Sequence, residues 1–134
     1  MVLEYILMLS WLGFIVISST LEAVYFYKKK AHVKWFGRNI HDSFTVIRSI
    51  FAVPISIITL VYVGWWEAVL MSILLILVFP FFHDGIYYTV RELIQKGTYP
   101  LYWFDQSEDT DAKYSYSIVT RTIFLIAALL MFPW

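Results

Sequence analysis

The sequence contains no cysteine, and only 15% of its 134 residues are charged. The absence of cysteine excludes disulfide bonds, thiolate metal sites and cysteine nucleophiles. Soluble domains usually carry about 25% charged residues, and a chain of this length has little core in which to bury apolar surface. Because 60% of the residues are hydrophobic, the excess apolar surface must face lipid or partner subunits. We therefore expect an integral, multi-pass membrane protein.

Recognised catalytic and metal-binding motifs are also missing. The sequence has no Gly-x-Ser-x-Gly elbow, no glycine-rich phosphate loop and no His-x-x-x-His or Glu-x-x-His spacing. The formal net charge is zero, so no basic field predicts a nucleic-acid partner. The sequence alone therefore leaves enzyme activity undecided and identifies no cofactor.

Four segments are apolar enough to cross a bilayer. A hydrocarbon core about 30 Å thick needs about 20 helical residues, within a range of about 17–25. Gly64 lies between the second and third segments, where so short a connection predicts an antiparallel hairpin. The predicted fold is an all-α bundle of four transmembrane helices in one domain of residues 1–134, with spans over residues 3–27, 41–63, 66–88 and 114–134.

The basic residues predict the orientation of this bundle. All ten Lys and Arg residues fall in the connections 28–40 and 89–113 or in the adjoining ends of the spans, whereas the opposite half carries only Glu4 and Glu67. Cytosolic loops are enriched in Lys and Arg, so we predict that both connections are cytosolic and that both termini are non-cytosolic. The first connection also supplies basic residues expected to contact lipid head groups, namely Lys28, Lys29, Lys30, Lys34 and Arg38.

Ionisable residues within the spans or at their edges form the candidate site, because such residues are costly in lipid and are functional candidates by default. Counting inward from the cytosolic boundary places Glu22, Arg48 and Arg121 at similar depths, so one acid and two arginines from three helices are expected to meet. Snorkelling of both arginines toward the head groups is the alternative. The predicted cluster comprises Glu22, His41, Asp42, Arg48, His83, Asp84 and Arg121.

Two His-Asp pairs lie at the cytosolic edges of the second and third spans. Their side chains, from His41, Asp42, His83 and Asp84, are sufficient in number and type to bind zinc, iron or manganese. Their spacing matches no metal signature, however, and ordinary ion pairing at the membrane edge is the competing interpretation.

Two functions are compatible with these patterns. The first is a small multi-span protein that acts by assembly, with copies of itself or with other membrane subunits. Its cytosolic-side cluster then either stabilises the bundle or lines a path for ions or protons. The second is a membrane-embedded enzyme, metal-dependent or not, that acts on a lipid or another membrane-associated substrate at the cytosolic edge. The small size and the lack of a catalytic motif favour the first. The nearly apolar outer halves of the spans argue against a continuous pore within one chain.

Overall fold

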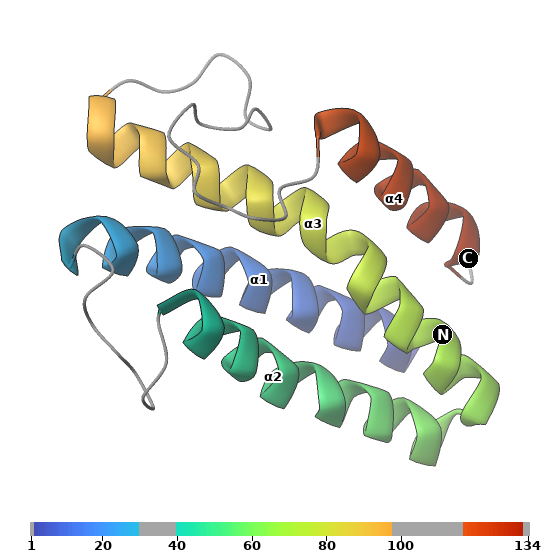
Figure 1. Cartoon of the computed structure of the whole chain (residues 1–134). Coiled ribbons are helices and arrows are strands. Elements are labelled where there is room, and N and C mark those ends of the chain that lie inside the picture. The colour runs from blue at the N-terminus through green and yellow to red at the C-terminus, as the bar shows by residue number, and fades with distance from the viewer. Residues whose placement is uncertain (1, 30–39, 98–116, 133–134) are drawn as a thin grey trace.

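The computed structural model describes residues 2–29, 40–97 and 117–132 of the chain. These residues form helices and no strands, which confirms the predicted all-α fold (Figure 1). Three of the helices are long and apolar enough to cross a membrane, as expected for a membrane protein. The four helices are α1 (Val2–Lys29), α2 (Ile40–Tyr62), α3 (Trp65–Lys96) and α4 (Ile118–Met131).

Helix α3 is the central element, because it packs against each of the other three helices. Its 32 residues measure about 48 Å at a rise of about 1.5 Å per residue, which exceeds the bilayer core of about 30 Å. The helix continues beyond residue 88, where the predicted third span ends, so the first residues of the predicted 89–113 connection are helical. Gly97 ends α3 in the left-handed conformation, with φ 66°, and its N–H donates to the Leu93 carbonyl.

Helices α2 and α3 form an antiparallel hairpin around Gly64, as the sequence predicts. The backbone N–H groups of Val63 and Gly64 both donate to the Thr59 carbonyl, at 2.9 and 3.0 Å. Gly64 has φ 155°, a conformation that L side chains rarely adopt. From this hairpin the two helices diverge, and α1 runs between them (Figure 1). The fold therefore has a narrow hairpin end and a wide end.

Helix α4 is shorter than the other three. Its 14 residues measure about 21 Å at a rise of about 1.5 Å per residue. The Ser117 side chain caps its first turn by accepting a hydrogen bond from the Thr120 N–H at 3.3 Å. The predicted fourth span, residues 114–134, extends outside the described residues at both ends. Four membrane crossings and the location of the termini therefore stay predictions.

The apolar core fills the half of the bundle nearer the hairpin. Buried side chains of α1 and α3 meet there, among them Ile15 and Leu74. The indole Nε1 of Trp11 donates a hydrogen bond to the Leu75 carbonyl at 3.1 Å and so ties α1 to α3. Large apolar side chains such as Ile50 of α2 remain exposed on the outside, where a membrane protein presents them to lipid.

Candidate functional site

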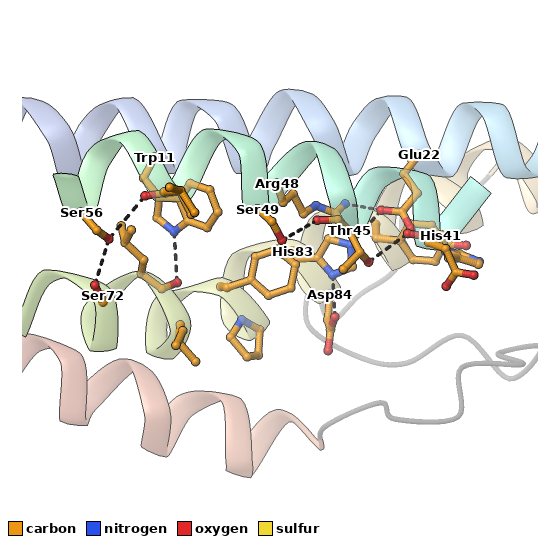
Figure 2. Close-up of a pocket in the computed structure, with 18 of the residues that line it drawn as sticks. Trp11, Glu22, His41, Thr45, Arg48, Ser49, Ser56, Ser72, His83 and Asp84 are labelled. Carbon is orange, nitrogen blue, oxygen red and sulfur yellow. Dashed lines mark hydrogen bonds and ion pairs between the residues drawn. The ribbon is translucent and has the colours of Figure 1, made fainter. Parts of the chain in front are cut away.

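Glu22 of α1 is the centre of the ionisable cluster. The residue is only 1% exposed, and groups from two other helices converge on its carboxylate (Figure 2). Its Oε1 lies 2.5 Å from Nδ1 of His41 on α2. Its Oε2 accepts a hydrogen bond from Nη2 of Arg48 on α2 and lies 3.1 Å from Nε2 of His83 on α3. One buried carboxylate thus links all three long helices.

Arg48 is held inside the bundle rather than extended toward the head groups. It is 7% exposed, and besides Glu22 it contacts the Ser18 hydroxyl, which lies 3.5 Å from its Nε. Its guanidinium carbon lies 5.2 Å from the ring centroid of Phe79 and 5.7 Å from that of Phe44. Such aromatic faces stabilise a cation that has lost its water. The arrangement is that of a buried ion pair and not of a snorkelling side chain.

His83 connects the cluster to a second carboxylate. Its Nε2 faces Glu22, and its Nδ1 lies 2.8 Å from Oδ1 of Asp84. His83 therefore lies between two carboxylates, with one ring nitrogen facing each of them.

A stripe along α3 extends the site beyond the predicted residues. Phe79, His83, Tyr87 and Arg91 recur at four-residue spacing and so share one helix face. The His83 ring stacks on Phe79 at 4.6 Å and on Tyr87 at 5.8 Å between centroids. Arg91 is buried, with its guanidinium carbon 5.3 Å from the Phe26 ring centroid. Phe79, Tyr87 and Arg91 were missed by sequence reasoning, although their spacing from His83 was available as a signal.

The structure brings most of the predicted cluster together. Glu22, His41, Arg48, His83 and Asp84 form one connected set of contacts. The set lies in a cavity between α2 and α3. Of the other two predicted members, Asp42 also lines this cavity and Arg121 does not.

Arg121 occupies a different position from Arg48. It lies in the first turn of α4, which packs against α3, and its side chain is fully buried. Of the expected meeting of one acid and two arginines, the structure shows the contact between Glu22 and Arg48, whereas Arg121 lies on α4.

Two further predictions concern lipid head groups and metal. The side chains of the predicted head-group contacts lie outside the described residues, although Lys28 and Lys29 belong to the last turn of α1. Within residues 2–29, 40–97 and 117–132, no group of three or more His, Asp and Glu side chains is arranged to hold a metal ion. In the set predicted as metal ligands, His41 and His83 each direct a ring nitrogen at Glu22, and Asp84 contacts His83.

A cavity of about 1490 Å³ follows the diverging faces of α2 and α3, with α1 as its floor. Its wide end is lined by the ionisable cluster (Figure 2). Toward the hairpin its lining becomes apolar, with Ile57, Leu60 and Val69 among the side chains there, and these are exposed on the outer surface. Between the two ends, the Ser56 and Ser72 hydroxyls form a 2.9 Å hydrogen bond that joins α2 to α3. The cavity is therefore a groove that is polar at one end and lined by exposed apolar side chains at the other.

Comparison of the chain with protein-family models, with curated proteins and with solved structures found no match in any of the three.

Proposed function

We propose that this protein binds an amphipathic membrane lipid in the groove between α2 and α3. The head group contacts the ionisable cluster at the wide end, and an acyl chain lies along the apolar part toward the hairpin. The observation that supports this proposal most strongly is the division of one groove into a charged end and an exposed apolar flank. A volume of about 1490 Å³ exceeds the range of about 300–1,000 Å³ for sites of drug-sized ligands, which agrees with a longer molecule.

The two parts of the groove make different contributions to this binding. In water, each buried methylene group contributes about 0.8 kcal/mol. In a bilayer the acyl chain leaves an equally apolar environment, so the apolar flank contributes little net free energy. Selectivity must then come from the wide end, where charged groups interact at low dielectric. The charged and polar side chains that line the wide end are thus the determinants of which lipid binds.

Loss of copurified lipid from a blocked groove tests this function. Native mass spectrometry of the protein extracted in mild detergent should show bound lipid on the wild type. Ala52→Trp places an indole inside the groove and should remove that lipid, whereas Leu130→Trp, at an exposed position of α4 outside it, should not. Circular dichroism confirms folding, and Val53→Trp provides a second block if Ala52→Trp does not fold. Equal lipid retention by a folded groove variant, or a lipid-free wild type, would overturn the proposal.

We propose in addition that all four helices cross the membrane, with both termini non-cytosolic. The ten basic residues all fall in the first and third connections or in the adjoining ends of the spans, and the apolar helix α4 packs on α3; both observations support this topology. The cysteine-free chain is a convenient background for single-cysteine labelling. Lys29→Cys should be labelled only from the cytosol, and Val63→Cys and Trp134→Cys only from the opposite side. Labelling of Lys29→Cys from outside would refute the orientation, and cytosolic labelling of Trp134→Cys would refute the fourth crossing.

The predicted assembly with copies of this chain or with other membrane subunits stays a prediction, as does ion or proton conduction. The exposed apolar faces of α2 and α4 suit lipid and a partner helix equally well. The lipid groove is closer to the second hypothesis formed from the sequence, because that hypothesis also places a lipid head group at the ionisable residues. Binding alone is proposed, since the contacts of the cluster identify no nucleophile.

A further inference from the structure

The charges that line the wide end of the groove restrict the head group that it can accept, given the lipid-binding function proposed above. Glu22 and Arg48 largely neutralise each other, because they are in direct contact and almost fully buried. Beyond this pair, the lining includes two carboxylates, one guanidinium and two imidazoles, from Asp42, Asp84, Arg91, His41 and His83, and Asp84 is in contact with His83. The lining therefore presents both signs of charge, and neither dominates.

A head group with a single sign of charge fits this lining poorly. An anionic head group would bring its negative charge close to Asp42 and Asp84, and like charges repel each other. A purely cationic one would oppose the buried guanidinium of Arg91 in the same way. A zwitterionic head group can place each of its charges beside a group of the opposite sign. Charge complementarity thus favours a phosphate and an ammonium in one molecule.

The aromatic side chains then distinguish between kinds of ammonium. A quaternary ammonium is bound through the faces of aromatic rings. Here the Phe79 ring already has the Arg48 guanidinium at 5.2 Å, and the Phe26 ring has the Arg91 guanidinium at 5.3 Å. A primary ammonium instead donates N–H groups to carboxylates, and Asp42 and Asp84 both line the groove.

We infer that the groove selects a phospholipid with a zwitterionic head group that ends in a primary amine, of the phosphoethanolamine type. The ammonium lies beside Asp42 and Asp84, on α2 and α3. The phosphate lies beside Arg91 and the exposed edge of His41, whose side chain is 47% exposed although its Nδ1 faces Glu22. The head group therefore bridges the diverging ends of the two helices, and the acyl chain follows the groove toward the hairpin.

Competition among lipids with identical acyl chains tests this inference. Delipidated protein is mixed with equimolar phosphatidylethanolamine, phosphatidylcholine and phosphatidylglycerol, and bound species are counted by native mass spectrometry. Phosphatidylethanolamine should exceed each competitor about tenfold, the factor that one charge-assisted hydrogen bond supplies. Asp42→Asn and Asp84→Asn should each lower the preference over phosphatidylcholine while lipid remains bound. The control Glu92→Gln changes a carboxylate outside the groove lining that pairs with Lys96, and its preference should equal that of the wild type.

The outcomes separate this inference from the function on which it rests. Binding without a preference, or with a preference for phosphatidylcholine or phosphatidylglycerol, overturns the primary-amine head group and leaves the lipid groove intact. Absence of binding from all three lipids overturns the groove as well. If an aspartate variant does not fold, the competition on the wild type alone decides between these outcomes.

Discussion

Removal of Arg48 should destabilise the protein far more than the loss of an exposed charge. Arg48→Met keeps most of the side-chain length but leaves the Glu22 carboxylate, 1% exposed, without its guanidinium. Breaking a buried ion pair by removing one partner typically costs about 3–5 kcal/mol. Because His41 and His83 still face the carboxylate, we expect a loss near the lower end, about 3 kcal/mol. That loss lowers the ratio of folded to unfolded protein by about two orders of magnitude.

A double-mutant cycle measures whether this cost comes from the ion pair. Glu22→Gln combined with Arg48→Met removes both charges, so the double variant should be more stable than Arg48→Met alone. We expect a coupling energy of about 2 kcal/mol, within the range for residues in direct contact. The free energy of unfolding is measured by titrating micelles with sodium dodecyl sulfate and following helicity by circular dichroism.

The exposed pair of Lys96 and Glu92 provides the matched control. Its atoms lie 3.4 Å apart, and the Lys96 side chain is 48% exposed. Exposed pairs of this kind contribute about 0–1 kcal/mol, so Lys96→Met should change stability little. If Arg48→Met proved no more harmful than Lys96→Met, or if Glu22→Gln gave no rescue, Arg48 would be a snorkelling side chain and the buried pair would be refuted.

Two further predictions concern the connection between α2 and α3. Ser56→Ala removes the hydrogen bond to Ser72 and should cost about 0.6 kcal/mol, the average for interhelical hydrogen bonds in a membrane protein. The control Ser10→Ala should cost less, since that hydroxyl bonds only within its own helix, and equal losses in the unfolding titration would contradict a tie between helices. Gly64→Ala should cost about 1–3 kcal/mol because of its positive φ. Gly13→Ala, which meets open space in α1, should be neutral or slightly stabilising, and a neutral Gly64→Ala would show that the hairpin adapts.

The sequence predicts the ion pair only from the depth of the two residues within their predicted spans. Glu22 and Arg48 lie at similar distances from the predicted cytosolic boundary. Counting residues from that boundary is therefore enough to place both side chains at the same depth. It does not give the rotation of each helix about its axis, which depends on packing between helices. Arg121 illustrates this limit: it lies at a similar predicted depth but on α4, outside the groove. Depth follows from local sequence, whereas the direction of a side chain requires the tertiary fold.

The composition of the sequence predicts neither the length of α3 nor the position of Arg91. Basic and polar residues after residue 88 are typical of a cytosolic connection, yet the helix continues to Lys96. The local signals for that end were present, since Lys96 occupies the last turn and Gly97 follows it. Arg91 lies in this extension, four residues after Tyr87, and both side chains line the groove. Positive charge predicts on which side of the membrane a segment lies, but not whether it is helical or buried.

The buried ion pair and the groove are two consequences of the same geometry. Replacing a buried ion pair by apolar side chains of similar volume often leaves stability unchanged or raises it, so stability alone does not explain the position of Glu22. Glu22 extends from α1 to His41 and Arg48 on one side and to His83 on the other. These contacts lie at the wide end, while Ser56 and Ser72 join the same helices nearer the hairpin. The carboxylate thus joins α2 and α3 at the wide end of the groove, beside the space where we propose that a head group binds, and apolar side chains of similar volume would not supply these contacts.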